Sequence, residues 1–308
     1  MIALALLANL AGATRDVRAA TNAPAVATEK IADGVFVFRY GAYRSLFVIN
    51  DAGVIVTDPL NEAAAPLYLQ AIRKLTAAPI THVIYSHSHW DRIAGATVFK
   101  QEGAEIIMQT ACAANLAEVM ARSPLAAPVI VPPDRVFEDQ LTINSGGNRI
   151  ELYDFGPSHD KCLAVLYLPA VNALFMPEMV SSLGASLPVD DITIGSYELS
   201  NIVNFFLAVE SLAETKGVET LIVGYARELP VAGAMAFEPA TGPVSLIRDQ
   251  RKFWEETLGY MDGLVAKGAQ SMFLDRIINY ERFEAYVGYD REAVFTMCRR
   301  IITWFATG

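Results

Sequence analysis

Apolar residues along the first two thirds of the chain fall into short runs that glycine, asparagine and proline separate. Runs of this kind, rich in valine, isoleucine and phenylalanine, predict β-strands. Longer segments with apolar residues at helical spacing predict α-helices between them. The predicted strands cover 35–40, 45–50, 53–57, 80–85, 105–109, 163–168, 172–176 and 219–223, with strand-like residues over 129–154; the predicted helices cover 64–76, 93–102, 111–121 and 198–215, and a loop is predicted over 181–197.

The pattern changes near residue 240, because only amphipathic segments follow, without strands between them. Strands that alternate with helices, twice over, predict an α/β fold with two β-layers covered by helices. The last part is a helical extension that could cover a site or form a homodimer interface. The predicted divisions are a tail or signal segment over 1–30, one αβ/βα domain over 31–240 and an extension over 241–308, with helices at 243–267, 272–287 and 290–306.

Composition narrows the classes of partner. The chain of 308 residues is 53% hydrophobic and carries a net charge of −10. A nucleic-acid binder or a protein of anionic membranes needs a basic face, and no cluster of Lys and Arg exists here. The apolar N-terminus lacks the preceding positive charge of an export signal and is too short to span a bilayer. Both a cytoplasmic and a periplasmic location therefore remain as expectations.

The three cysteines, Cys112, Cys162 and Cys298, match no zinc ribbon and no disulfide framework by their spacing. An odd number of distant cysteines is typical of free, buried thiols, and we expect that here.

Candidate chemistry lies in the stretch YSHSHWDR, which follows an apolar strand. His87 and His89 are two residues apart, so their side chains point the same way on an extended loop. His159, in GPSHDKC, also lies just past a predicted strand and can supply a third imidazole. Three imidazoles with an open fourth position are typical of a catalytic zinc site, where bound water is activated. His82 lies inside a strand and is expected to be a structural histidine.

These residues carry a resemblance. HSHWD followed by IAG, GPSH ahead of an apolar hairpin, Asp58 in VIVTDP, LFMPEMV and the late LIVGY resemble the metallo-β-lactamase superfamily over about residues 31–230. The resemblance implies a four-layered αβ/βα sandwich with metal at the strand ends. It implies that His87, His89 and His159 form the first metal site and that Asp58 supports a ligand histidine. Members are mostly hydrolases, and a few are iron oxygenases.

The second metal site of that superfamily is altered here. Asp91 matches one of its carboxylate ligands, but Arg92 stands where the motif has a histidine. Glu178 replaces the usual bridging aspartate, and Tyr225 follows Gly224 where a histidine is usual. Because a guanidinium accepts no metal and always carries its charge, we expect one ion rather than two.

Several roles remain open for the altered residues. Arg92 could stabilise an oxyanion, anchor a substrate carboxylate, or form a buried ion pair with Asp91 or Glu178. Asp91 could act as a general base or cap a helix. Glu178 could be a fourth ligand of the first site or the partner of Arg92. Tyr225 could donate a proton to a leaving group or be a buried structural residue.

Three functions are consistent with these residues. The leading one is a mononuclear zinc hydrolase that uses a metal-bound hydroxide on the carbonyl of an ester, lactone, thioester or amide. The apolar 181–197 loop, Trp90 and the extension suggest an apolar or aromatic small-molecule substrate. The second is a mononuclear non-haem iron dioxygenase, since histidines and a carboxylate also suit ferrous iron. The third is a non-catalytic metal-binding or scaffold protein with a degraded site.

Overall fold

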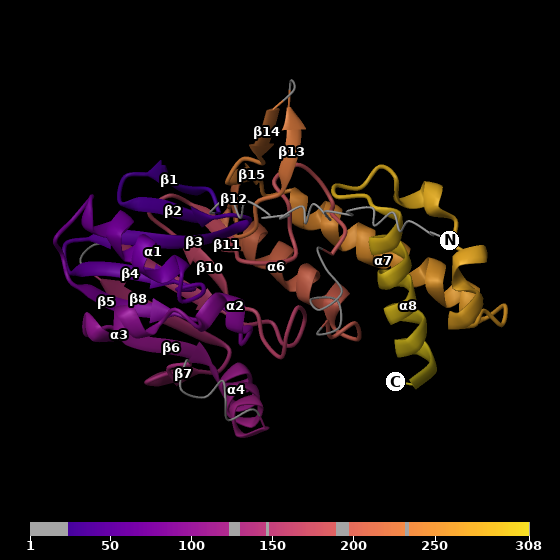
Figure 1. The fold of residues 1–308 in the computed structure, drawn as a ribbon, viewed down its shortest axis with the longest axis horizontal. Helices are drawn as coiled ribbons and strands as arrows, with labels where there is room; N and C mark the ends of the chain where they lie inside the picture. Colours follow the sequence, from indigo (N-terminus) through magenta and orange to yellow (C-terminus); the bar gives the residue numbers. More distant parts are fainter. Residues whose placement is uncertain (1–23, 123–129, 146–147, 189–196, 232–233, 308) are drawn as a thin grey trace, which may run out of the picture.

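Two β-sheets lie face to face, and helices cover the outer face of each (Figure 1). This arrangement is taken from a computed structural model, which describes residues 24–122, 130–145, 148–188, 197–231 and 234–307. It is the four-layered α/β sandwich with a C-terminal helical region that the sequence predicted. Most of the predicted tail and part of the predicted 181–197 loop lie outside the described residues.

The first sheet has seven strands in the order of the chain. Its first four strands are antiparallel neighbours, and its last four pair in parallel. Parallel pairing brings the carboxyl ends of β4, β5 and β6 to one edge of the sheet. The strands are β1 (Val26–Ala32), β2 (Val35–Tyr40), β3 (Tyr43–Asn50), β4 (Gly53–Thr57), β5 (Ile80–Ile84), β6 (Glu105–Gln109) and β7 (Arg135–Phe137).

The second sheet has six strands in the order β15-β12-β11-β10-β9-β8. Within it only β11 and β12 are parallel, so their carboxyl ends lie side by side. A separate two-stranded hairpin, β13–β14, projects from the sandwich (Figure 1). The strands are β8 (Gln140–Ser145), β9 (Asn148–Tyr153), β10 (Val165–Leu168), β11 (Ala173–Met176), β12 (Thr220–Val223), β13 (Glu228–Val231), β14 (Ala234–Phe237) and β15 (Thr241–Pro243).

Successive side chains along each strand point alternately to the two faces of its sheet, and this alternation produces the layers. Ile55 of β4 and Phe175 of β11 point between the two sheets and share one buried cluster. Their neighbours Val56 and Met176 point outward, into the clusters that the helices cover. One face of a strand therefore packs on the opposite sheet and the other on helices. The outer helices are α1 (Ala64–Arg73), α3 (Thr97–Gln101) and α4 (Thr110–Arg122) on the first sheet, and α6 (Ile202–Lys216) and α7 (Leu246–Val265) on the second.

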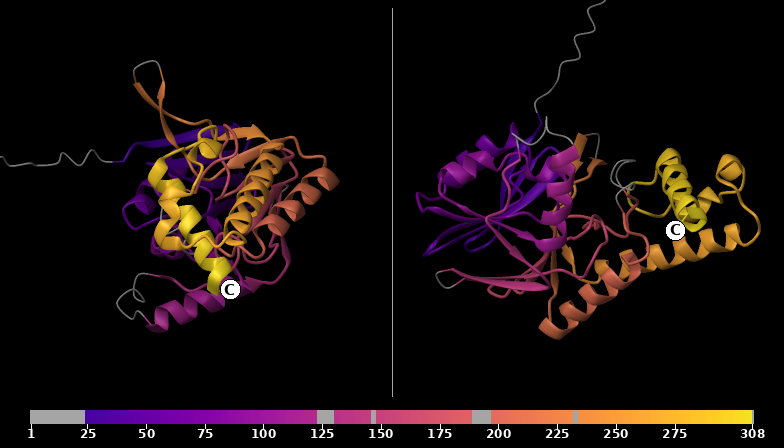
Figure 2. Two further views of the ribbon diagram at one scale, coloured as in Figure 1. Left: turned by 90° about the vertical axis from the view of Figure 1, so that its right-hand side faces the viewer. Right: turned by 90° about the horizontal axis from the view of Figure 1, so that it is seen from below.

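The C-terminal extension shares its core with the second sheet. Trp254 of α7 is buried in the same cluster as Met176 of β11. Beyond the sandwich, α8 (Arg291–Thr307) lies alongside α7 (Figure 2). The domain boundary predicted at residue 240 stays a prediction, although β15 continues the second sheet as far as Pro243.

Two predicted helices differ in the structure. The segment 272–287 forms two short 3-10 helices, η1 (Ser271–Arg276) and η2 (Tyr280–Phe283), rather than one α-helix. The segment 93–102 is divided into α2 (Trp90–Ile93) and α3. Gly95 lies between them, and a Cβ there would be 2.7 Å from the carbonyl oxygens of Pro59 and Asn61. Close backbone approach therefore interrupts the helical pattern.

Candidate metal centre

The centre begins where two parallel strands of the first sheet end. Asp58 directly follows β4, and the segment with His87 follows β5. Because β4 and β5 pair in parallel, the two segments meet at one edge of the sheet. Asp58 has a left-handed backbone conformation with φ 35° and is fully buried. Such a conformation in a non-glycine residue concentrates at functional sites.

A chain of hydrogen bonds links Asp58 to His87 through Ser86. The Ser86 backbone N–H donates to Asp58 Oδ1, and the Ser86 hydroxyl donates to Asp58 Oδ2, both at 2.8 Å. The same hydroxyl lies 2.8 Å from His87 Nδ1. Because its only proton goes to Asp58, the hydroxyl must accept from Nδ1–H. The protonated Nδ1 leaves the lone pair of His87 on Nε2.

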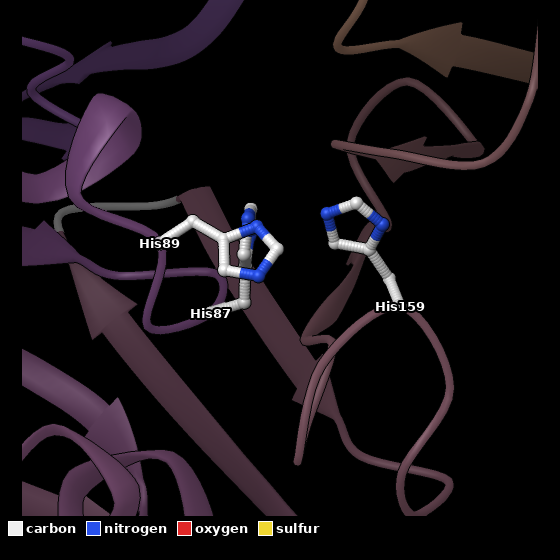
Figure 3. A group of neighbouring side chains, drawn as sticks. All are labelled: His87, His89 and His159. Carbon is white, nitrogen blue, oxygen red and sulfur yellow. The ribbon is translucent and has the colours of Figure 1, made fainter. Parts of the chain in front are cut away.

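His87, His89 and His159 come together in what we call the histidine cluster (Figure 3). One nitrogen from each can be chosen so that all three lie within 4.8 Å of one another. His87 and His89 come from the loop after β5, and His159 comes from the loop between β9 and β10 of the second sheet. His87 Nε2 is buried and has no hydrogen-bond partner among the described residues. The donor set and this buried acceptor fit a divalent ion.

The charge state of the cluster also suits a ligand role. Burial is the main cause that holds the pKa of His87 and of His159 well below the usual value, and the neighbouring His89 and Arg92 lower both further. Imidazole binds metal only in its neutral form. For Asp58, burial raises the pKa to about 6, and the charge of Arg92 opposes that rise. The Asp58 carboxyl is therefore still mostly ionised at neutral pH.

A second chain of hydrogen bonds, which the sequence analysis missed, joins the two histidine loops. Asp160, next to His159, accepts from the backbone N–H of Ser88 at 2.9 Å and also from its hydroxyl. Asn115 of α4 donates to the same hydroxyl at 2.9 Å. Ser88 lies between His87 and His89, so Asp160 ties the loop of His159 to the loop of the other two. The alternation of Ser and His, with Asp after the third His, was the available signal.

The cysteine expectation is corrected in part. Cys112 of α4 and Cys162, just before β10, form a disulfide across a sequence separation of 50 residues. Only Cys298 is a free, buried thiol, as expected for all three. The wide spacing gave no sign of the pair, because only the packing of α4 against the His159 loop brings the two sulfurs together.

Arg92 lies beside the cluster, in what we call the arginine site. Its guanidinium is fully buried and pairs with Glu178. Its Nη1 donates to the carbonyl of Arg44 at 3.0 Å, and its Nη2 donates to the carbonyls of Pro177 and Gly224, each at 3.1 Å. Arg92 thus holds the ends of β11 and β12 to β3. Arg92 forms the buried ion pair with Glu178 that was one of its three predicted roles, and the two roles in which it contacts substrate stay predictions.

Glu178 takes the second of its two predicted roles, that of the partner of Arg92, and the role of fourth metal ligand stays a prediction. It pairs with Arg92 and is not part of the metal-capable group that the described residues form. The physical reason is that a buried guanidinium requires a counter-ion. Burial raises the pKa of Glu178 to about 7, and Arg92 opposes that rise. Gly224 is needed beside this pair, since a Cβ there would lie 2.4 Å from the backbone of Pro177.

The two remaining candidates lie at the rim. Asp91 is exposed in the first turn of α2, where it makes no side-chain cap, and it is hydrogen-bonded to Tyr43. Burial and the Asp91 charge raise the pKa of Tyr43. Tyr225 is half-buried just after β12 and packs edge-on against Tyr43, with ring centroids 5.8 Å apart. The catalytic roles predicted for Asp91 and Tyr225 stay predictions.

The family model of the metallo-β-lactamase superfamily matches residues 40–176, which include all three histidines of the cluster. Solved metallo-β-lactamases share the fold. The enzyme of Pontibacter korlensis is 18% identical in sequence to this chain, and the two structures superpose with a TM-score of 0.59 over 75% of this chain and 99% of that one. The DIM-1 metallo-β-lactamase gives the same TM-score at 17% identity, over 76% and 99% of the two chains.

The sequence match over residues 40–176 and the shared fold support the metallo-β-lactamase superfamily. Curated relatives are remote. One is the 2,4-dinitroanisole O-demethylase subunit alpha of a Nocardioides species, 27% identical over 51% of this chain and 47% of its own length. Another is the type 2 metallo-β-lactamase of Bacteroides fragilis, 27% identical over 43% of this chain and 50% of its own length. The chain therefore spans about half the length of the curated relatives that it matches.

Superfamily membership and the three-histidine cluster together fit a metal-dependent enzyme. No helix among the described residues is both long and apolar enough to cross a membrane. His82, the fourth histidine, is half-buried in β5 and lies 3.6 Å from a carboxylate oxygen of Glu105. It takes no part in the cluster, as the sequence predicted.

Proposed function

We propose that the protein is a metal-dependent hydrolase that cleaves an ester, lactone, thioester or amide, with one ion at the histidine cluster. The observation that carries this proposal is the cluster of buried His87 and His159 with half-buried His89, in which His87 Nε2 has no protein partner among the described residues. A buried acceptor without a partner costs stability unless a ligand satisfies it.

Each residue of the centre would have its own role in the reaction. A divalent ion held by the three histidines would act as a Lewis acid and lower the pKa of a bound water to about 7. Asp58, through Ser86, keeps the proton of His87 on Nδ1 and so keeps Nε2 turned to the ion. Asp91, an exposed carboxylate two residues after His89, would accept a proton from water or return it to the leaving group. Tyr225 is the candidate donor to the developing oxyanion.

A single ion is favoured by the arginine site. Arg92 fills the position that a second metal ligand would take, and its charge is already balanced by Glu178. A divalent ion about 4 Å from the guanidinium would be repelled by roughly 8 kcal/mol at an effective dielectric of ~20. Because Arg92 is held by three backbone carbonyls, it has no room to turn away.

The test is a hydrolysis screen with metal-stripped protein that is reloaded with zinc or with ferrous iron. The panel holds aryl esters, lactones, thioesters, a β-lactam and, because of the name of one relative, 2,4-dinitroanisole. We expect turnover of one carbonyl class with zinc, lost in His87→Ala. His82→Ala is the matched control, because His82 lies outside the cluster.

Two results would overturn the proposal. Oxygen consumption with ferrous iron and no hydrolysis would replace it with oxygenase chemistry. Metal-independent turnover, equal in His87→Ala and the unchanged protein, would remove the histidine cluster from the reaction.

A further inference from the structure

A narrow pocket lies between the histidine cluster and the helical extension, and we call it the tryptophan pocket. Its walls come from three segments: the loop after β11, the loop after β12, and α7. Tyr197 joins it to the metal centre, because its ring lies 5.2 Å from that of His159 and 5.6 Å from that of Trp254. The residues that matter for its chemistry are Glu178, Tyr197, Tyr225, Arg227, Gln250 and Trp254.

The first sign of a ligand is the indole of Trp254. The side chain is 1% exposed, yet its Nε1 has no hydrogen-bond partner among the described residues. An indole N–H can only donate, and buried indoles usually find an acceptor. Because the pocket borders this side chain, an acceptor brought by a ligand would satisfy the donor.

The second sign is the charge of Arg227. Its guanidinium donates to the carbonyl of Leu187, but no carboxylate of the described residues lies within ion-pair distance of it. The charge of Glu238 raises the pKa of Arg44 as well as that of Arg227, against the lowering that burial causes in both. Gly288 makes room for the guanidinium, since a Cβ there would lie 2.0 Å from Nη1. A positive charge is thus held at the pocket without a carboxylate of its own.

The carboxylate and the amide oxygen that line the pocket already have partners of their own. Glu178 lines the pocket but pairs with Arg92. Gln250 uses its amide on Ser186, accepting from its N–H at 2.8 Å and donating to its carbonyl at 3.0 Å. The pocket therefore offers donors and one fixed positive charge, and few acceptors.

The pocket is also held in shape before any ligand binds. The two hydrogen bonds between Gln250 and Ser186 fix the loop after β11 to α7. On its other side the same loop pairs with the segment before α8: Val287 N–H donates to Ala185 at 2.9 Å, and Leu187 N–H donates to Val287 at 3.0 Å. A site that needs little ordering loses less free energy on binding.

We propose that the mouth of the tryptophan pocket binds a carboxylate of the substrate, with Arg227 and the indole N–H of Trp254 as its donors. Guanidinium and carboxylate match in charge and geometry. The part of the inference that concerns turnover rests on the proposed hydrolase function. The part that concerns binding does not.

Turnover is tested with two matched 4-nitrophenyl esters, one of terephthalic acid and one of its monoamide, which differ only in a carboxylate against a carboxamide. Hydrolysis adds one water and releases the acid and 4-nitrophenolate, which is followed by absorbance. We expect kcat/KM to favour the carboxylate ester. In Trp254→Phe and in Arg227→Gln that preference should fall about tenfold, the scale of one lost hydrogen bond to a charged group.

Arg227→Lys keeps the charge and should retain part of the preference. The matched control is Trp304→Phe, a partly buried tryptophan of α8 outside the pocket, which should leave the preference unchanged. Circular dichroism and thermal unfolding confirm that each variant folds. If all variants hydrolyse the esters with the same preference for the carboxylate ester, the proposal that the tryptophan pocket binds the carboxylate is wrong.

Binding is measured separately by titration calorimetry with benzoate and with benzamide. Benzoate should bind more tightly, and Arg227→Gln should remove the difference. If no ester is hydrolysed but benzoate binding depends on Arg227, the pocket stands and the hydrolase proposal fails. If benzoate does not bind, or binds equally in Arg227→Gln, the pocket proposal fails whatever the turnover.

Discussion

The histidine cluster and the arginine site are neighbours built on the same strand ends, yet they are completed in opposite ways. At the arginine site, the charges of Arg92 and Glu178 balance each other, three backbone carbonyls accept from Nη1 and Nη2, and only Nε of Arg92 has no partner among the described residues. At the histidine cluster, the lone pair of His87 Nε2 has no partner among the described residues. The chain itself balances the charge of the arginine site, whereas the histidine cluster presents a lone pair that a metal ion could accept.

The difference suggests how a site closed by the chain can be distinguished from one that can hold a metal. Arg92 stands where the superfamily motif has a histidine, and Glu178 balances its fixed charge. The cluster keeps its supports, Asp58 through Ser86 and Asp160 through Ser88. Such supports orient metal ligands, and their persistence favours a working site over a degraded one.

The largest expected effect comes from breaking the arginine site on one side. Arg92→Met leaves the Glu178 carboxyl buried without its partner, so the free energy of unfolding should fall by about 3–5 kcal/mol. The double variant Arg92→Met/Glu178→Met should recover most of that loss, because it buries no uncompensated charge. Urea unfolding measures both. Losses that simply add would show that the two side chains are not coupled.

The disulfide fixes α4 to the segment that follows the loop of His159 and so stabilises the histidine cluster. Replacing Cys112 and Cys162 by serine should lower the free energy of unfolding by about 4 kcal/mol, as expected for a closed loop of 50 residues. Because Cys162 follows the loop of His159, zinc affinity should fall as well. Thiol titration of the denatured, unreduced protein should find one thiol, that of Cys298. Three thiols would contradict the disulfide.

The support of His87 can be weakened without touching a ligand. Asp58→Asn replaces the carboxylate that fixes Ser86 and, through it, the tautomer of His87. We expect zinc affinity, measured by competition with a chromogenic chelator, to fall about 10–100-fold. Asp134→Asn is the control, since Asp134 accepts from Lys100 and from the backbone N–H of Ile106, outside the loops that carry the three histidines. Equal effects of both variants would contradict the role of Asp58.

The pH dependence of metal-free protein should distinguish the two sites by sign. Burial raises the pKa of Glu178 to about 7, so between about 4.5 and 7 the native state binds more protons than the unfolded chain. Its contribution to the free energy of unfolding therefore falls as pH rises through that window. Burial lowers the pKa of His87, so its contribution rises as pH increases toward about 6.5.

Each contribution is read as a difference from the unchanged protein, by urea unfolding at intervals between pH 4.5 and 7.5. Glu178→Gln should remove the decline, and His87→Gln should remove the rise. Differences of the same sign in both variants would contradict the assigned environments of the two groups.

Much of the fold followed from local pattern. The strands β2 to β6 and the hairpin of β10 and β11 were evident from short apolar runs between turn formers, and the three histidines were evident from their position after strands. The resemblance to the metallo-β-lactamase superfamily then predicted the four-layered arrangement of sheets and helices. These features are encoded within a few residues, where periodicity and turn chemistry act directly.

What the sequence did not reveal depends on contacts between distant segments. The pairing of Cys112 with Cys162, the bond of Asp160 to Ser88 and the choice of Arg92 as the partner of Glu178 all join separate elements. The interruption at Gly95 likewise comes from the approach of the loop after β4. No spacing rule along one chain reports such contacts, so Glu178 could be read equally as a ligand or as a counter-ion.

The most direct test of the central claim is the metal content per chain, measured by elemental mass spectrometry on protein purified without added metal, beside His159→Ala and Arg92→His. The account predicts about one ion in the unchanged protein, a loss of that ion in His159→Ala, and still about one in Arg92→His, where Tyr225 leaves the second site short of a ligand. Two ions in the unchanged protein would contradict the reading of Arg92 as a barrier. None would contradict the metal centre itself.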